Sequence, residues 1–185
     1  MSRIVVLIGS MRENGNTHTL AKSFIDGARL NNEVEVISVS KYKVNPCLGC
    51  NSCYTSEENR CIQRDDMQMI YEKIAQADIL VIASPVYFYG LSAEIKAIID
   101  RLHTPMRKTF RVKKMALLLV AATDIPHLFD PIIMQYNMSL SFFRLESLGI
   151  IAVGGVKDIG DIEDNEALAQ AFKLGESIKG NRCIP

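Results

Sequence analysis

The amino-acid sequence predicts an α/β fold in which helices cover both faces of a five-stranded parallel sheet. Five short apolar runs rich in β-branched residues recur along the 185 residues, and segments with helical spacing separate them. Strands that are buried on both faces read as continuous apolar runs, which is typical of a parallel sheet. No internal repeat, low-complexity tract or linker interrupts the alternation, so the pattern indicates a three-layer sandwich.

Each apolar run predicts one strand. In chain order the predicted strands are 4–8, 34–39, 79–83, 115–121 and 150–153. The first helix follows the first strand, because residues such as Leu20 and Phe24 recur at helical spacing. The later helices are predicted at 66–77, 92–102, 131–145 and 165–178. We expect Asp65 or Asp66 to cap the second helix and Ser92 to cap the third.

The length fits a single domain, 1–185, which can bury roughly 70% of the surface that the unfolded chain exposes. A short chain of alternating elements favours the flavodoxin-like strand order 2-1-3-4-5, whose switch point lies between the first and third strands. A ligand is expected there, beside the carboxyl ends of both strands. A cysteine-rich loop at about 45–64 separates the second strand from its helix, and such a long loop in a compact domain is usually functional.

Composition narrows the classes of protein to which the chain can belong. The content of 48% hydrophobic and 23% charged residues is that of a globular protein, and no apolar run approaches the ~20 residues that cross a bilayer. Lys plus Arg and Asp plus Glu are both 21, so net charge supports neither nucleic acid nor a membrane as partner. The start, Met1-Ser2-Arg3, leads directly into a strand, so we expect a cytoplasmic protein whose cysteines are thiols or ligands.

The turn after the first strand has the features of a phosphate site. It reads Gly9-Ser10-Met11-Arg12-Glu13-Asn14-Gly15-Asn16-Thr17 and leads into a helix, whose free N–H groups and partial positive charge favour an anion. Glycine lets the backbone bend towards the ligand, while hydroxyls, amides and one cation add donors and charge. An ordinary capped loop is the alternative. The candidate contacts are Ser10, Arg12, Asn14, Gly15, Asn16 and Thr17.

A second candidate ligand loop follows the third strand. Pro85 removes a donor where the ladder ends, and three aromatic residues follow without the polar residues usual in a surface loop. Flat side chains and freed backbone groups suit a planar heterocycle, although one aromatic, most readily Phe88, could instead pack beneath the next helix. Thr123, after the fourth strand, is a weaker third contact. The candidates in the second loop are Pro85, Val86, Tyr87, Phe88, Tyr89 and Gly90.

Two motifs carry a family resemblance. They are Gly9-Ser10-x-Arg12-x-Asn14-Gly15-Asn16-Thr17, and Pro85-Val86-Tyr87 with Leu91-Ser92, Lys96 and Ile99-Asp100-Arg101. Together they resemble the NAD(P)H-dependent FMN reductase and iron-sulfur flavoprotein branch of the flavodoxin-like fold, and the resemblance spans most of the chain. It implies bound FMN, with its phosphate on the first loop and its ring edge along 85–90. It also implies NAD(P)H as co-substrate, a homodimer or homotetramer, and a structural or interfacial role for Lys96 and Arg101.

Four cysteines lie close together in the long loop. Cys47, Cys50, Cys53 and Cys61 form Cys-x2-Cys-x2-Cys-x7-Cys, a compact run that can hold a 4Fe-4S cluster. The run also resembles the cysteine motif of the iron-sulfur flavoproteins. The same ligands fit tetrahedral zinc, and free thiols are a third interpretation. Cys183 lacks partners in sequence and is treated as incidental.

The remaining polar residues give weaker indications. Because none of His18, His103 and His127 has a partner at ligand spacing, each is interpreted as a surface or capping residue. The basic run 107–114 is interpreted as a solvated loop before a strand that could attract an anionic nicotinamide cofactor. Other phosphate-binding classes lack their signatures. A nucleotide triphosphatase loop needs a lysine after its second glycine, a dinucleotide fold needs Gly-x-Gly-x-x-Gly, and a cysteine phosphatase needs a cysteine in the first loop.

Three hypotheses on function follow. The leading one is an FMN-dependent oxidoreductase that passes electrons from NAD(P)H to a small-molecule acceptor or an electron-transfer protein. No general acid or base is assigned, because the cofactor supplies the chemistry. The second is an iron-sulfur flavoprotein that acts as an electron carrier or redox sensor without nicotinamide oxidation. A zinc-bound interaction module is the third.

Overall fold

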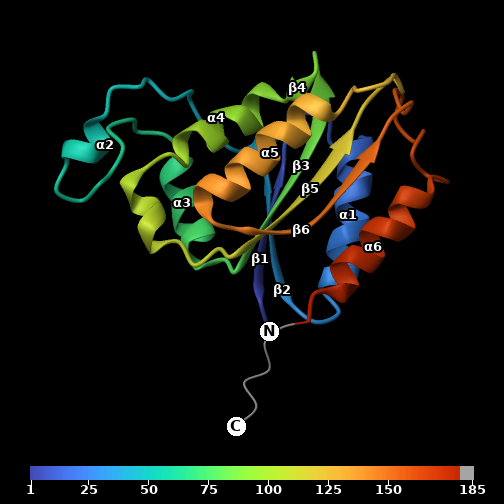
Figure 1. Ribbon diagram of the computed structural model, residues 1–185, viewed down its shortest axis with the longest axis horizontal. Coiled ribbons are helices and arrows are strands. Elements are labelled where there is room, and N and C mark those ends of the chain that lie inside the picture. The colour runs from blue at the N-terminus through green and yellow to red at the C-terminus, as the bar shows by residue number, and fades with distance from the viewer. Residues whose placement is uncertain (180–185) are drawn as a thin grey trace, which may run out of the picture.

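One twisted parallel sheet organises the computed structural model, which describes residues 1–179 (Figure 1). Its strands lie in the order β2-β1-β3-β5-β6, with β4 paired antiparallel to the end of β3. The bounds are β1 (Arg3–Ile8), β2 (Glu33–Ser38), β3 (Ile79–Tyr87), β4 (Gly90–Leu91), β5 (Lys114–Val120) and β6 (Glu146–Val153). The predicted sheet of five parallel strands therefore lacks β4. This strand has only two residues, too few to give a periodic pattern.

Helices form the two outer layers of the sandwich. They are α1 (Asn16–Ala28), α2 (Ser52–Thr55), α3 (Met67–Gln76), α4 (Ala93–Arg101), α5 (Asp130–Phe143) and α6 (Glu166–Ser177), with 3-10 turns η1 (Val39–Lys41) and η2 (Pro105–Thr109). Helices α1 and α6 lie side by side on one face, and α3, α4 and α5 cover the other (Figure 1). Alternate residues of β1 enter the two cores: Ile4 and Val6 face α1 and α6, and Val5 and Leu7 face the other helices.

Strand β3 extends four residues beyond its predicted end. Ser84 and Pro85 pair with the end of β5, and Val86 and Tyr87 pair with β4. Helix boundaries agree within two residues with those predicted after the first helix, and Ser92 caps α4 by accepting a hydrogen bond from the Ile95 N–H at 3.4 Å. The short elements α2, η1 and η2 are not predicted, because one turn leaves no periodicity to recognise.

No helix among residues 1–179 is both long and apolar enough to cross a membrane. Cys183 lies outside the described residues.

Candidate functional site

The pairing of β1 with β3 brings the two predicted ligand loops together. Ile8 lies opposite Ala83, and the Gly9 N–H donates to the Ala83 carbonyl at 2.7 Å. A side chain at Gly9 would collide with the start of α4, because its Cβ would lie 2.9 Å from Ser92 Oγ and closer still to Ile95. The backbone of the first loop therefore packs directly against the amino end of α4, with no room for a side chain at Gly9. We call the carboxyl edge of the sheet at which loop 9–17 and hairpin 85–91 meet the β1–β3 crevice.

The start of α1 presents polar groups to the β1–β3 crevice. Its N-cap, Gly15, makes no side-chain capping bond, and the first turn carries no acidic residue. Ser10 and Thr17 are buried, and Ser10 Oγ accepts a hydrogen bond from the Arg12 N–H at 3.2 Å. Asn14 adopts a left-handed conformation with φ of 63°, which turns the chain into the helix. The uncapped N–H groups of this turn match the needs of a phosphate.

The side chain of Asn16 is already occupied. Its Nδ2 donates to the Asp158 carbonyl at 2.8 Å, and its Oδ1 accepts from the Gly160 N–H at 3.2 Å. These bonds fasten the loop after β6 to the first turn of α1. Asn16 can therefore offer an anion its backbone N–H but not its amide side chain. Arg12 is exposed, so its guanidinium is available to an incoming ligand.

The second loop is a tight β-hairpin. Its turn residues Phe88 and Tyr89 both have positive φ, 47° and 62°, which is uncommon for bulky side chains. Ser84 fixes the base of the hairpin, because its Oγ donates to the Pro85 carbonyl at 2.8 Å and accepts from the Ser92 N–H at 3.0 Å. Phe88 is 97% exposed at the tip, so the expectation that it packs beneath the next helix is wrong. The turn directs it away from α4.

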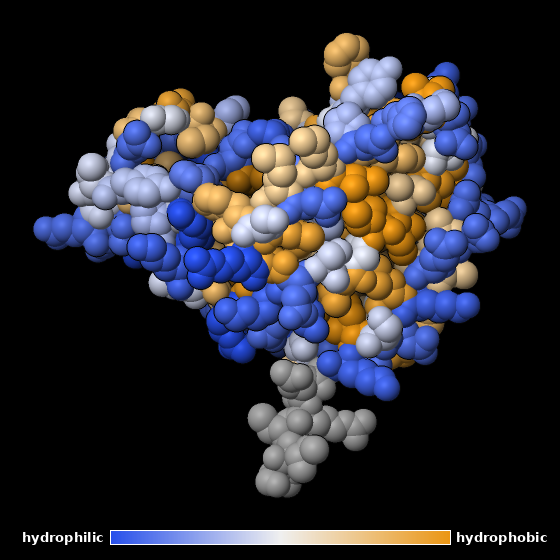
Figure 2. Space-filling model, viewed as in Figure 1, coloured by the Kyte–Doolittle hydropathy of each residue, from blue (hydrophilic) through white to orange (hydrophobic). Residues whose placement is uncertain are grey.

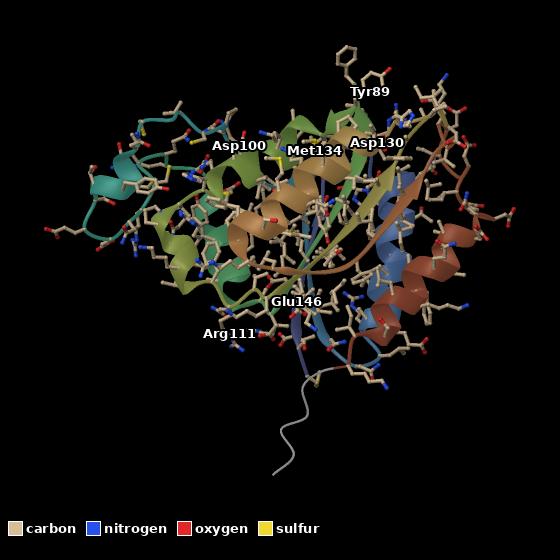
Figure 3. All side chains as sticks on the ribbon, in the orientation of Figure 1. Tyr89, Asp100, Arg111, Asp130, Met134 and Glu146 are labelled. Carbon is tan, nitrogen blue, oxygen red and sulfur yellow. The ribbon has the colours of Figure 1, made fainter. Side chains whose placement is uncertain are left out.

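The other predicted contacts lie at the same edge of the sheet. Tyr87 and Tyr89 are about half exposed, at 54% and 49%, and Tyr89 projects from the end of β3 (Figure 3). Thr123 is exposed in the loop that follows β5, the strand beside β3. The structure thus places loop 10–17, hairpin 85–90 and Thr123 at the carboxyl edge, where a flat phosphorylated ring could lie between donors and aromatic faces.

The cysteine loop, defined as residues 46–64, projects near the carboxyl end of α4, away from the hairpin at its amino end (Figure 1). Cys47 and Cys50 are exposed, whereas Cys53 and Cys61 are partly buried. A hydrogen bond with Ser52 lowers the pKa of the Cys50 thiol. Burial raises the pKa of the Cys53 thiol, and the nearby charge of Cys61 adds to the effect. Among residues 1–179 no three His, Cys, Asp or Glu side chains converge on one metal position. The donor chemistry fits iron-sulfur or zinc, but the thiols are not gathered.

A buried ion pair closes the neck of the cysteine loop. The Arg101 guanidinium on α4 contacts the Asp65 carboxylate at 2.5 Å, and both side chains are 2% exposed. The same carboxylate accepts from the Asn45 N–H at 2.9 Å, and Arg101 donates to the Asn45 carbonyl at 3.2 Å. Burial opposes ionisation of Asp65, but the Arg101 hydrogen bond and backbone donors outweigh it and lower its pKa. We call Asp65 and Arg101 the neck pair, because they hold both ends of the loop.

A second contact fastens the middle of the cysteine loop. The Tyr54 hydroxyl lies 3.2 Å from His103 Nδ1, and Arg107 donates to the same hydroxyl at 3.3 Å. The His103 ring stacks on Phe142 with centroids 5.4 Å apart. Residue Tyr54 adjoins Cys53, so these side chains dock the cysteine segment on the ends of α4 and α5.

The histidines and the basic run differ in part from the sequence interpretation. His127 Nδ1 lies 2.7 Å from the Asp130 carboxylate at the surface, so it has a partner near the start of α5. Arg111 pairs with Asp78 at the amino edge of the sheet, the end opposite Tyr89 (Figure 3). The basic run therefore lies far from the β1–β3 crevice.

Sequence reasoning anticipated the neck pair only in part, because the resemblance implied a structural or interfacial Arg101 but gave no partner for it. Its signal was an arginine on the apolar face of a helix, since Ala97 and Ile98 are buried on the same face as Arg101. A charged residue at such a position requires a buried partner. The sequence alone did not indicate that Asp65, beyond the cysteines, would be that partner.

Comparison with known proteins connects the β1–β3 crevice to a family. Residues 2–127 match the family model described as NADPH-dependent FMN reductase, and the match contains both ligand loops, the cysteine loop and the neck pair. A solved structure of an NAD(P)H:quinone oxidoreductase from Methanothermobacter marburgensis superposes with a TM-score of 0.71 at 18% identity, covering 95% of this chain and 96% of that one. At that identity the likeness shows the shared fold.

Two relatives are informative in sequence. An iron-sulfur flavoprotein from Methanocaldococcus jannaschii is 38% identical over 112 residues, which cover 60% of this chain and 56% of that protein. A Bacillus subtilis protein, provisionally named as an NAD(P)H-dependent FMN-containing oxidoreductase, is 29% identical over 180 residues, 93% of this chain and 96% of its own. The chain spans about half the length of the iron-sulfur flavoproteins it matches.

Proposed function

Because the chain belongs to the NADPH-dependent FMN reductase family, we propose that it binds FMN in the β1–β3 crevice and passes electrons from NAD(P)H through that flavin. The acceptor is a small molecule, such as free flavin or a quinone, or an electron-transfer protein. FMN, when bound, supplies the hydride and electron-transfer chemistry, and the protein supplies binding, orientation and electrostatics.

The observation that carries this proposal is the uncapped start of α1 facing a rigid aromatic hairpin. The first-turn N–H groups and the buried hydroxyls of Ser10 and Thr17 would hold the phosphate, with Arg12 adding a positive charge from the surface. Asn14 and Gly15 shape the turn, and Asn16 locks it to the loop after β6. The free N–H groups, the two hydroxyls and Arg12 together would meet the needs of an anion.

Hairpin 85–90 would lie along the edge of the ring. Its backbone is fixed by Ser84, so N–H groups beyond Pro85 are held ready to donate to ring oxygen and nitrogen atoms. Such donors favour the anionic reduced ring and raise its potential. Tyr87 and Tyr89 exclude water from one side, and Thr123 adds a hydroxyl at the neighbouring strand end. We assign no side chain as a general acid or base.

The absorption spectrum of freshly purified protein tests the proposal. We expect flavin bands that NADPH bleaches without oxygen and that return when an acceptor is added. Protein that lacks these bands and takes up no added FMN would refute it.

A second function is supported by the four cysteines, which offer soft ligands close together in sequence on a loop fastened to the core. In this alternative the chain is an iron-sulfur flavoprotein that exchanges electrons with a protein partner, and the cysteines hold a 4Fe-4S cluster. Anaerobic purification with iron and sulfide analysis separates the two functions. Four irons per chain with slow NADPH oxidation supports the carrier, whereas rapid NADPH oxidation by iron-free protein supports the reductase.

We further propose that the working unit is a homodimer, or a dimer of such dimers. Helix α5 exposes apolar side chains on its outer face, with Met134 at 66% and Met138 at 64% exposure, and Phe88 stands free at the hairpin tip. Light scattering coupled to gel filtration tests the assembly, and a monomer at micromolar concentration would refute it.

A further inference from the structure

A large pocket lies between α5 and the sheet, and of its lining residues only Leu91 belongs to hairpin 85–91 and none to loop 9–17 or the cysteine loop. It measures about 560 Å³ and reaches from Leu91, at the base of the hairpin, to Lys113, before β5. Its walls are aliphatic and aromatic side chains of β3, β5, α4 and α5, such as Ile82, Leu117 and Ile132. Small-molecule pockets usually measure about 300–1,000 Å³, so a pocket of this size is suited to a ligand.

Helix α5, which forms one wall of the cavity, buries few of its side chains. The helix sequence is strongly apolar, yet Ile132 and Tyr136 are its only buried residues. Apolar side chains remain visible over and beside α5 in the space-filling view (Figure 2). The Tyr136 hydroxyl is already satisfied, since it donates to the Met115 carbonyl at 2.7 Å and lies 2.9 Å from Ser147 Oγ. The uncharged lining is otherwise apolar except for Gln135 and Ser139, whose Oγ donates to the Gln135 carbonyl at 2.9 Å.

Four basic residues line the cavity. Its lining includes Arg107 and Lys108 of η2, Lys113 before β5 and Arg144 at the end of α5, and no carboxylate. None of the four forms an ion pair among residues 1–179. Their neighbour Lys114, outside the lining, pairs with Glu146 at 3.4 Å.

The overall composition and the helix dipole do not account for these cations. Acidic and basic residues balance at 21 each over the chain, so the excess at the cavity is local. The negative end of α5 favours a cation at Arg144. It does not explain Lys108 and Lys113, which belong to η2 and to the segment before β5.

We propose that this cavity binds a free amphipathic anion, an unbranched alkyl chain that ends in a carboxylate. The chain lies along the apolar wall between α5 and the sheet, and the carboxylate meets Lys108, Lys113 and Arg144 at the rim. This site is separate from the β1–β3 crevice and uses the basic run that the flavin chemistry leaves without a role.

Isothermal titration of FMN-saturated protein with dodecanoate, below its micelle concentration, tests the site. Saturation with FMN fills the flavin site, so binding there cannot be mistaken for binding in the cavity. We expect one dodecanoate per chain, with dodecanol bound at least tenfold more weakly and dodecyltrimethylammonium not bound. Equal affinity for dodecanoate and dodecanol would overturn the proposal, because the cations would then contribute nothing.

Matched variants locate the binding. The double variant Lys108→Ala/Lys113→Ala should weaken dodecanoate at least tenfold and leave dodecanol unchanged, whereas Lys114→Ala, the paired neighbour, should alter neither. Ser139→Phe, which fills the cavity from α5, should weaken both ligands, and far-ultraviolet circular dichroism verifies that it folds. The proposal fails if Lys114→Ala weakens dodecanoate as much as the double variant. It also fails if the protein binds anionic phospholipid vesicles but not free dodecanoate.

Discussion

The β1–β3 crevice and the cysteine loop differ in what holds them in place. The crevice is built on paired strands of the core, and its turns are fixed by short bonds such as the one from the Gly9 N–H to the Ala83 carbonyl at 2.7 Å. The cysteine loop has one short helix and no strand, and two of its four thiols are exposed. One buried ion pair holds its ends. The turns of the crevice are thus fixed by bonds to the core, whereas the thiols of the loop do not converge on one position among residues 1–179.

The largest expected effect comes from substitution of the neck pair, which holds the cysteine loop and is not part of the β1–β3 crevice. Arg101→Met leaves the Asp65 carboxylate buried and unpaired, so we expect the free energy of unfolding to fall by about 3–5 kcal/mol. Replacing both members, as Asp65→Leu/Arg101→Met, removes the uncompensated charge and should restore most of that loss. Urea unfolding measures both variants.

Two further results sharpen this test. Lys96→Met, which removes an exposed pair with Asp100, should cost no more than about 1 kcal/mol. The double variant should still bind FMN, but trypsin should cut its cysteine loop faster than in the wild type. A double variant whose loop resists trypsin like the wild type would contradict the role given to the neck pair.

The next effect concerns the crevice alone. Gly9→Ala places a Cβ against Ile95 and Ser92 Oγ, so we expect a loss of about 1–3 kcal/mol in unfolding free energy through overpacking. FMN affinity should fall with it, while the proteolysis rate of the cysteine loop stays unchanged. Thermal unfolding measures the loss of stability, and flavin titration measures the FMN affinity. Faster cleavage of the cysteine loop would show that the two regions are not independent.

A smaller effect probes the phosphate contacts. Thr17→Val keeps the shape of the side chain but removes its hydroxyl. We expect the loss of one hydrogen bond, about 1–1.5 kcal/mol, to weaken FMN binding roughly tenfold. The matched control is Ser23→Ala on the same helix, whose hydroxyl donates to the Leu168 carbonyl at 2.6 Å on the other side. Fluorescence quenching of FMN measures both, and equal affinities for the two variants would exclude Thr17 from the phosphate site.

The smallest effect depends on pH. The folded pKa of Asp65 lies below its ordinary value, so the ionised carboxylate stabilises the fold above the unfolded pKa of about 3.9. That contribution is lost as the pH falls through the folded pKa. We expect loop cleavage by pepsin to accelerate below about pH 4 in the wild type and to show no such step in Asp65→Leu/Arg101→Met. A step of the same size in the double variant would assign it to another group.

Sequence patterns predicted the crevice better than the loop, and the reason is physical. Buried parallel strands are apolar along their length, so the runs at Ile4–Ile8 and 79–83 revealed both strands and therefore the switch point. The hairpin strand Gly90–Leu91 and the exposed tip at Phe88 depend on turn geometry. The run of aromatic residues does not indicate that geometry, so neither feature was predicted. The neck pair joins residues 36 apart in sequence, and no local pattern encodes such a contact. The placement of the thirteen predicted flavin contacts remains a prediction until a ligand is bound.

Titration of metal-free, flavin-free protein with FMN and with riboflavin most directly tests the claim that the crevice at the start of α1 binds a phosphorylated flavin. The two ligands differ only in the phosphate that the α1 N–H groups and Ser10 and Thr17 would hold. We predict one FMN per chain, with riboflavin bound at least a hundredfold more weakly. Equal affinity for the two ligands, or no binding of FMN, would contradict the account.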